Sequence, residues 1–213
     1  MTTILFSGLS TEHGHELWVS DGTLAGTQLL KDINPGEASS NPIDFARLDD
    51  DRVLFVADDE PNGRELWVSD GTEDWTTLVL NIHPMGDSDP RYMTPLSDGR
   101  ALFSADDGTH GRELWITDGT ASGTRLVRDI NPGDEDSFPQ DFVPLGDGRA
   151  VFRADGGTGS GYELWVSDGT EAGTSMVRAI SAGGPFDAPD LLTPLGDGRV
   201  VFRANDGETG FEP

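Results

Sequence analysis

The segment GRELWITDGTASGTRLVRDINPG, residues 111–133, is one of four near-copies of a single pattern in this chain. The other three are GHELWVSDGTLAGTQLLKDINPG (14–36), GRELWVSDGTEDWTTLVLNIHPMG (63–86) and GYELWVSDGTEAGTSMVRAISAGG (161–184). The tryptophans of the four ELW motifs are 49, 48 and 50 residues apart, at Trp18, Trp67, Trp115 and Trp165. A repeat of this length predicts an array of supersecondary units, none of which can bury its apolar face alone.

Each repeat is predicted to form four short strands joined by turns. Between residues 92 and 107, two apolar runs flank the dipeptide Asp98-Gly99, which favours a tight hairpin. ELWIT then alternates its side chains between two faces, as a strand does, and RLVRDI supplies a fourth strand before a long polar connection. No apolar positions recur at helical spacing. A fifth copy begins at Val201 and stops at Pro213, before its tryptophan, so we expect a slice of a longer array.

This repeated unit predicts an all-β fold. A four-stranded antiparallel meander with a period of about 40–50 residues is typical of a β-propeller blade. We expect four blades closed by pairing of the N- and C-terminal strands, because closure removes exposed sheet edges; residues 190–196 would then contact residues 3–8. Five blades with incomplete ends, or a strand-swapped dimer, are the alternatives. The expected single domain, 1–213, contains blades at 42–82, 91–130 and 140–180 and a composite blade of 3–33 plus 189–206.

The composition is strongly acidic, with 14 Lys and Arg against 39 Asp and Glu and a formal charge of −25. This charge repels phosphate backbones and anionic lipids, so we expect no nucleic-acid partner. The absence of cysteine excludes disulfides and thiolate metal sites. No apolar stretch approaches the about 20 residues of a membrane span, so we expect no membrane insertion. The first ten residues, MTTILFSGLS, do not have the pattern of a signal peptide.

The ELW and DGT motifs occur together in all four copies, with the DGT aspartates at Asp21, Asp70, Asp118 and Asp168. This pattern resembles the bacterial ELWxxDGT repeat family, which occurs in large exported and surface proteins. The resemblance covers almost the whole chain. It implies a propeller-like repeat at an extracellular or cell-surface location and no defined enzymatic activity. The chain departs from the pattern where DWT (74–76), IHPMG (82–86) and ISAGG (180–184) stand.

The Glu and Trp of each ELW motif have two interpretations. As scaffold, the Trp would pack between blades and the Glu would anchor a turn through hydrogen bonds. As a lectin-like site, the Trp would stack on a sugar ring and the Glu would accept hydrogen bonds from sugar hydroxyls. Their presence in every copy favours the scaffold interpretation. The candidate glycan-binding residues are Glu16, Trp18, Glu65, Trp67, Glu113, Trp115, Glu163 and Trp165.

Acidic loops punctuated by glycine recur at equivalent turns. Calcium takes about six to eight oxygen ligands, and such loops can supply carboxylates and carbonyls together. No segment matches an EF-hand loop, and solvated acidic loops are the alternative. Calcium is therefore the candidate cation, and no other cofactor is indicated. The candidate ligands are Asp58, Asp59, Asp106, Asp107, Asp155 and Asp206.

A catalytic site should break the symmetry of the repeat. The residues that break it are Trp75, His83, Met85, Tyr92, Phe138, Tyr162 and Phe186. They contain no nucleophile–base pair, and the four histidines do not have the spacing of a zinc site. We therefore predict a non-catalytic extracellular module with a structural or interaction role, either a monomer or a strand-swapped dimer, whose partner is a protein or a glycan. A lectin-like propeller is the alternative function, and a glycan-acting enzyme is the third.

Overall fold

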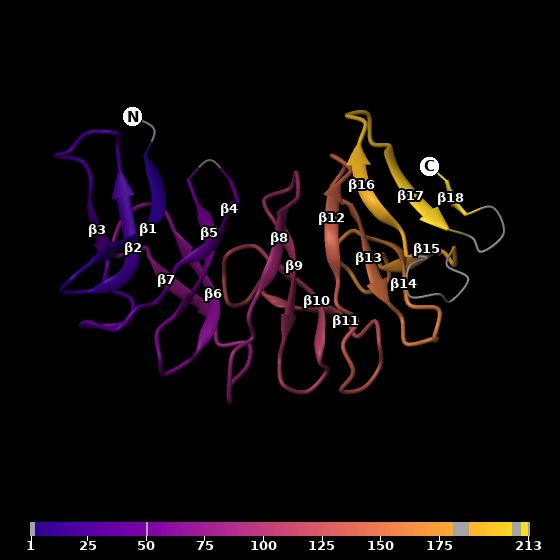
Figure 1. The fold of residues 1–213 in the computed structure, drawn as a ribbon, viewed down its shortest axis with the longest axis horizontal. Helices are drawn as coiled ribbons and strands as arrows, with labels where there is room; N and C mark the ends of the chain where they lie inside the picture. The colour runs from indigo at the N-terminus through magenta and orange to yellow at the C-terminus, as the bar shows by residue number, and fades with distance from the viewer. Residues whose placement is uncertain (1–2, 50, 181–187, 206–209, 213) are drawn as a thin grey trace.

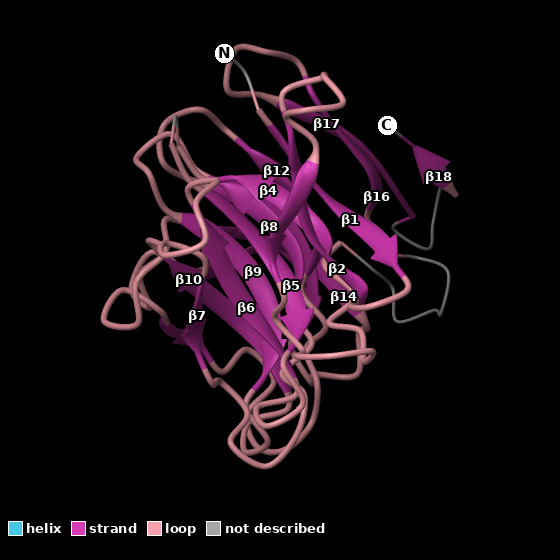
Figure 2. Cartoon of the chain, turned by 90° about the vertical axis from the view of Figure 1, so that its left-hand side faces the viewer, coloured by secondary structure: helices cyan, strands magenta, loops and turns pink. Residues whose placement is uncertain are grey.

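The computed structural model describes residues 3–49, 51–180, 188–205 and 210–212. The regular structure of these residues consists of strands, without a helix (Figure 1; Figure 2), which confirms the all-β prediction. The strands form five antiparallel sheets that follow one another along an open arc (Figure 1). None of the described segments forms a helix that is long and apolar enough to span a bilayer.

Three of the sheets have four strands each, joined in chain order. They are β4 (Ile43–Arg47), β5 (Val53–Asp58), β6 (Arg64–Ser69) and β7 (Thr77–Leu80); β8 (Arg91–Pro95), β9 (Ala101–Asp106), β10 (Arg112–Thr117) and β11 (Arg125–Arg128); and β12 (Gln140–Pro144), β13 (Ala150–Asp155), β14 (Tyr162–Ser167) and β15 (Ser175–Arg178). The terminal sheets have three strands each in the described residues. They are β1 (Ile4–Ser10), β2 (Gly14–Ser20) and β3 (Gln28–Lys31), and β16 (Asp190–Pro194), β17 (Val200–Asn205) and β18 (Phe211–Glu212).

The first strand of each four-stranded sheet lies on the concave side of the arc. β4 contacts β8, β8 contacts β12, and β12 contacts β16, so these strands form a continuous inner row (Figure 1). Figure 2, turned by 90°, shows β4, β8 and β12 in one region, with β6, β7 and β10 further out. The third strand of each four-stranded sheet carries the ELW motif.

In the part of the chain that the structure describes, the sheets do not close into a four-blade ring. β1 pairs with β2 and β16 with β17, and the sheets that contain β1 and β16 lie at opposite ends of the arc (Figure 1). Within one chain, the expected composite blade of 3–33 with 189–206 and the expected contact of 190–196 with 3–8 are therefore wrong. A four-blade ring needs a quarter turn between neighbouring sheets. Because the five sheets leave their two ends apart, neighbouring sheets must be related by a rotation smaller than a quarter turn.

The tryptophans of the ELW motifs pack between neighbouring sheets. Trp115 lies in one apolar cluster with Leu54 and Leu66 of the preceding sheet and Phe103 of its own sheet. The ring centroids of Trp115 and Phe103 are 6.4 Å apart, at a tilt of 37°. The tryptophans of the second and fourth copies lie in corresponding clusters. Each buried ring therefore joins two sheets, which neither sheet could achieve alone.

Polar contacts between neighbouring sheets involve the DGT turns. Arg52 Nη1 donates to the carbonyl oxygen of Asp118 at 2.7 Å, and Arg100 Nη2 donates to that of Asp168 at 3.0 Å. The turn after Asp168 also approaches the preceding sheet closely, since a Cβ at Gly169 would lie 2.1 Å from the Ile116 side chain. Gly169 has a φ of +80°, which other residues rarely adopt. Both the backbone conformation and the close approach therefore require the glycine of DGT.

Each inner strand is interrupted by a bulge. In β8 the register with β9 shifts between Arg91 and Thr94, and β4, β12 and β16 have corresponding shifts. At every bulge a residue other than glycine has a left-handed φ: Asp44 (53°), Tyr92 (58°), Asp141 (57°) and Leu191 (55°). A non-glycine residue in such a conformation costs about 1–3 kcal/mol. The bulges are therefore strained features of the concave side.

Candidate functional site

The ELW glutamates hold the connections between sheets. Glu113 is fully buried. Its Oε2 accepts hydrogen bonds from the Ile130 N–H at 2.8 Å and the Ser137 hydroxyl at 2.6 Å, and its Oε1 accepts them from the N–H groups of Asn131 at 3.4 Å and Ser137 at 3.1 Å. Burial raises the pKa of Glu113 to about 7, although these donors act in the opposite direction. Glu113 thus acts as a clasp for the connection that follows its sheet.

The glutamates of the other copies have the same role. Glu16 clasps the connection from Ile33 to Ser40, and Glu65 clasps that from Ile82 to Ser88. Burial raises the pKa of both carboxyl groups. Glu163 is buried as well and accepts a hydrogen bond from the Ile180 N–H. A sugar hydroxyl cannot reach carboxylates that are buried in this way.

The tryptophans are equally unsuited to stacking on a sugar. Trp67, Trp115 and Trp165 are only 6%, 7% and 6% exposed, because each is covered by the preceding sheet. Trp18, in the first sheet of this structure, is half-buried. The assignment of the ELW glutamates and tryptophans as a glycan site is therefore corrected, and these residues form the scaffold.

The aspartates considered as calcium ligands bond to the backbone of their own turns. Asp58, Asp106 and Asp155 each accept a hydrogen bond from the N–H two residues later. Asp59 binds Asn62, and Asp107 binds the backbone and imidazole of His110. Asp206 lies outside the described residues. Among the residues that are described, no group of three or more His, Cys, Asp or Glu is placed to hold a metal ion.

The side chains of the inner strands differ from sheet to sheet, in contrast to the repeated ELW and DGT residues. Three positions, one just before the inner strands and two within them, illustrate this variation. In the order of the four sheets, the first position holds Asn41, Asp89, Phe138 and Ala188; the second holds Ile43, Arg91, Gln140 and Asp190; and the third holds Asp44, Tyr92, Asp141 and Leu191. Because the same fold accepts all of these side chains, their identities are not set by the scaffold. The concave side is therefore the candidate site.

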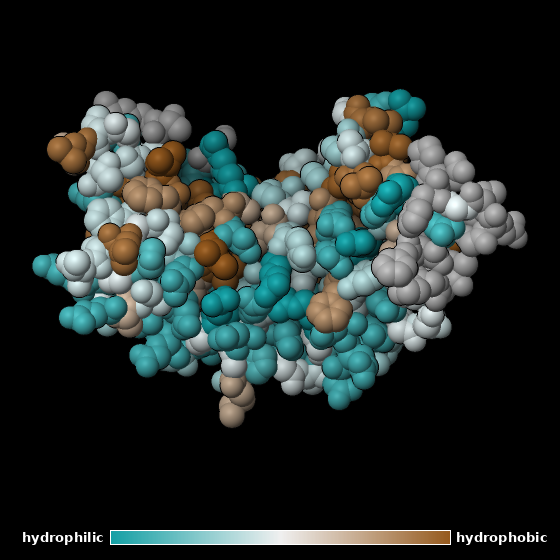
Figure 3. All heavy atoms as spheres, viewed as in Figure 1, coloured by the Kyte–Doolittle hydropathy of each residue, from teal (hydrophilic) through white to brown (hydrophobic). Residues whose placement is uncertain are grey.

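Two neighbouring hollows open on this side, where Figure 3 shows the molecule indented between its two ends. The larger, the β4–β8 hollow, has a volume of about 550 Å³. It is lined by Ile43, Asp44, Phe45, Ala46, Arg64, Asp89, Arg91, Tyr92 and Met93. The smaller, the β8–β12 hollow, has a volume of about 80 Å³ and is lined by Arg91, Tyr92, Ser104, Arg112, Phe138, Pro139 and Gln140. Arg91 and Tyr92 line both hollows and form the wall between them.

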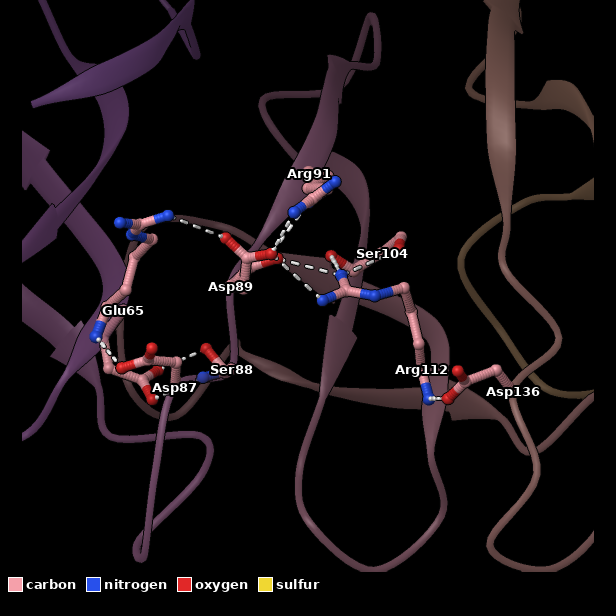
Figure 4. A network of polar contacts seen from close by, with 9 residues as sticks. Glu65, Asp87, Ser88, Asp89, Arg91, Ser104, Arg112 and Asp136 are labelled. Carbon is pink, nitrogen blue, oxygen red and sulfur yellow. Dashed lines mark hydrogen bonds and ion pairs between the residues drawn. The ribbon is translucent and has the colours of Figure 1, made fainter.

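Three arginines surround one carboxylate at this wall (Figure 4). Arg91 Nε donates to Asp89 Oδ2 at 2.8 Å, Arg112 Nη2 approaches the same oxygen at 3.4 Å, and Arg64 Nη1 lies 3.5 Å from Asp89 Oδ1. Arg112 Nη1 also donates to the Asp89 carbonyl oxygen at 2.9 Å. Asp89 therefore positions the three guanidinium groups, while Asp106 and Asp136 also act electrostatically on Arg112.

The three arginines differ in accessibility. The Arg112 side chain is 14% exposed, and burial lowers its pKa, although the guanidinium group stays charged. The Arg64 and Arg91 side chains are 39% and 54% exposed. Arg91 uses Nε and Nη2 on Asp89, which leaves Nη1 with no protein partner among the described residues. Arg64 and Arg91 are therefore the groups that can meet a ligand.

The residues that break the repeat fall into two groups. Tyr92 and Phe138 line the β8–β12 hollow, and Tyr162 lies beside the inner strands, with the Arg153 guanidinium group 5.3 Å from its ring centroid. Burial raises the pKa of the Tyr162 phenol. Trp75, His83 and Met85 line neither hollow, and Phe186 is outside the described residues. The departures from the repeat thus included part of the site, but not Arg64, Arg91 or Arg112, because arginine occurs throughout the repeats.

No protein-family model matches the chain, and a comparison with curated proteins finds no match. Among solved structures, puromycin hydrolase superimposes with a TM-score of 0.56 and 20% identity over 93% of this chain and 30% of its own. The S511A mutant of puromycin hydrolase complexed with PGG has a TM-score of 0.52 and 16% identity, and the match covers 90% of this chain and 29% of the mutant's chain. TolB from Acinetobacter baumannii has a TM-score of 0.48 and 16% identity, and the match covers 96% of this chain and 49% of the TolB chain. The two puromycin hydrolase structures, with TM-scores above 0.5 and identities of 20% and 16%, support a propeller-type fold alone. The chain spans about three tenths of the length of puromycin hydrolase.

Proposed function

We propose that this chain is a non-catalytic interaction module of the propeller type that binds its partner on the concave side. The observation that carries the proposal is the division of labour within each repeat. The ELW and DGT residues are the same in every copy, and they are buried or hydrogen-bonded within the scaffold. The inner-strand residues vary, and they are exposed around the two hollows. Variation on a constant scaffold suits recognition, as in other repeat architectures.

The ELWxxDGT resemblance supports an exported or cell-surface location for the module. The formal charge of −25 fits such a setting, because it keeps a protein soluble and disfavours nucleic acid as a partner. We therefore place the module outside the cell and expect a protein or glycan partner.

Binding without turnover is supported by the chemistry of the site. Most glycan-cleaving enzymes use a carboxylic acid that donates a proton and a second carboxylate that acts as base or nucleophile. The ELW glutamates are enclosed by their own hydrogen bonds, and Asp89 is engaged by three guanidinium groups. These arrangements hold the carboxylates in hydrogen bonds and ion pairs, so they position charge and do not present a paired acid and base.

An array that displays both oligosaccharides and peptides tests this proposal. We expect the wild type to bind a subset of the array, the double variant Arg91→Ala/Tyr92→Gly to lose that binding, and the bound material to be released chemically unchanged. Arg149→Ala is the matched control, because Arg149 is about as exposed as Arg91, pairs with a neighbouring aspartate in the same way and lines neither hollow. Cleavage of the bound material, or equal binding by the double variant, would overturn the proposal.

A further inference from the structure

We propose that the β4–β8 hollow binds a carboxylate-bearing sugar that is part of an otherwise neutral glycan. This inference rests on the proposed function, since it names the ligand of the same concave side. The hollow has a volume of about 550 Å³, which lies within the about 300–1,000 Å³ of small-molecule sites. Its lining combines guanidinium groups, carboxylates and aromatic rings, and each of these has a counterpart on an acidic sugar.

The guanidinium groups account for the carboxylate. Arg64 of β6 and Arg91 of β8 both form ion pairs with Asp89, and both side chains are more than a third exposed. Figure 4 shows Arg91 directed toward Asp89. Asp89 holds one edge of the Arg91 guanidinium group through Nε and Nη2, so the remaining Nη1 is presented in a fixed orientation. Arginine binds carboxylates through directed, charge-assisted hydrogen bonds. A ligand carboxylate at this point would meet donors that are already in place.

The aromatic side chains account for the sugar ring. Tyr92 is 46% exposed, and Phe45, on the opposite wall, is 37% exposed and stacks on Phe55 with ring centroids 5.6 Å apart. Tyr92 keeps its side chain at a φ of 58°, where glycine would relieve strain. The chain places glycine at many other positive-φ positions. A half-exposed tyrosine at a strained position contributes little to packing, so its ring suits contact with the apolar face of a sugar.

The acidic groups of the hollow limit the ligand further. Asp44 and Asp89 also line it, and their oxygens can accept hydrogen bonds from sugar hydroxyls. At longer range the formal charge of −25 repels any polyanion. A uronic acid polymer or a run of acidic residues in a peptide would therefore be disfavoured. One carboxylate flanked by hydroxyl-rich neutral sugars satisfies both the local arginines and the overall charge.

The β8–β12 hollow indicates in which direction a longer glycan would extend from the β4–β8 hollow. Arg91 and Tyr92 also line the β8–β12 hollow, together with Phe138 and Gln140. A neutral sugar next to the acidic one would therefore continue past the wall toward β12, where the Phe138 ring is exposed and Gln140 is half-buried. The site follows the inner strands from one sheet to the next.

The test is an array of oligosaccharides in matched pairs, whose members are identical except that one carries a single glucuronic, galacturonic or sialic acid in place of a neutral sugar. A hexaglutamate peptide is included, and affinities of the bound members are measured by calorimetry. We expect the wild type to bind at least one acidic member about tenfold more tightly than its neutral partner, the preference given by one good charge-assisted contact. Arg91→Ala should remove this preference, and Arg149→Ala should retain it. Tyr92→Gly should weaken binding of both members while its melting temperature stays equal or rises.

Two outcomes would overturn the inference and remain distinct from failure of the proposed function, and a third would remove both. Equal binding of acidic and neutral members that depends on Tyr92 would leave a concave binding surface without carboxylate selection. Binding of hexaglutamate through Arg91 in the absence of any glycan would leave that surface with a peptide as its ligand. Binding that no inner-strand variant affects, or no binding at all, would remove both the inference and the proposed function.

Discussion

The clasp formed by Glu113 provides a direct test of the scaffold through the substitution Glu113→Gln. At pH 5 the Glu113 carboxyl group is protonated, but both of its oxygens still have lone pairs that can accept hydrogen bonds. Glutamine keeps one carbonyl oxygen, and its NH₂ group cannot accept from the two donors that it faces. With the carbonyl in the place of Oε2, the buried N–H groups of Asn131 and Ser137 lose their acceptor. Each buried, unsatisfied group costs about 1–3 kcal/mol. We therefore expect the free energy of unfolding at pH 5 to fall by about 2–4 kcal/mol, allowing for some relaxation.

This loss should shrink as the pH rises. The pKa of Glu113 is raised by burial from 4.5 to about 7. A carboxyl group with a raised folded-state pKa stabilises the fold fully below its unfolded pKa, and that contribution is lost as the pH rises through the folded pKa. One pKa unit corresponds to about 1.4 kcal/mol, so the wild type should lose about 2–3 kcal/mol at this group between pH 5 and pH 8. The glutamine variant has no such titration, and the two proteins should approach each other in stability.

Urea denaturation at pH 5 and pH 8, followed by tryptophan fluorescence, measures both effects. Glu171→Gln serves as the control, because Glu171 is exposed on a DGT turn and its substitution should change stability by less than about 0.5 kcal/mol. The reasoning is refuted if Glu113→Gln matches the wild type at pH 5, or if the difference between them grows toward pH 8.

Further predictions concern packing, strain, acid and salt. Trp115→Ala should lower the free energy of unfolding by about 3–5 kcal/mol, as for other buried aromatic residues, and an unchanged urea midpoint would contradict its burial between sheets. Tyr92→Gly should leave the free energy of unfolding unchanged or raise it by up to about 1 kcal/mol, because relief of strain outweighs the added backbone entropy of the unfolded chain. A loss above about 1 kcal/mol would show that the Tyr92 ring is part of the core. Hydrogen bonds from Arg100 and Thr170 lower the pKa of Asp98 and Asp168 respectively. The two carboxylates therefore stabilise the fold above about pH 4, and this stabilisation is lost as the pH falls through their folded-state pKa. Melting curves from pH 5 to pH 2 would record the loss. CaCl₂ and NaCl at matched ionic strength should raise the melting temperature equally through screening; a larger shift with CaCl₂ would indicate a calcium site.

The local structure could be predicted because the same signals recur in each copy. The Asp-Gly turns indicate hairpins, and the alternation of ELWIT indicates a strand with two different faces. The burial of Trp67 and Trp115 follows from the same pattern, since a large apolar residue at the same place in every unit is most simply covered by the next unit. Closure could not be predicted in this way. The rotation between sheets depends on how rings such as Trp115 and Phe103 fill the space between them, and no local sequence pattern encodes that volume.

The site was harder to predict, because it depends on the bulges of the inner strands. In a regular strand Arg91 and Tyr92 would point to opposite faces, and an alternating pattern assigns only one of them to the concave side. The left-handed φ at Tyr92 changes this, and both side chains line the same hollows. Glycine would have marked such a position in the sequence, whereas Asp44, Tyr92, Asp141 and Leu191 do not.

The same bulges explain why recognition can be concentrated on the inner strands without loss of the fold. Most of the apolar burial lies further out, between the second and third strands of neighbouring sheets, and the connections are held by buried glutamates such as Glu113. A substitution at Tyr92 therefore changes the free energy of unfolding only through local strain and the partial burial of its ring. A substitution at Trp115 affects the packing of two sheets at once. A chain built in this way can vary one inner strand at a time. Neighbouring hollows that share a wall, as at Arg91, would then combine the variations of successive repeats into the binding surface that we propose.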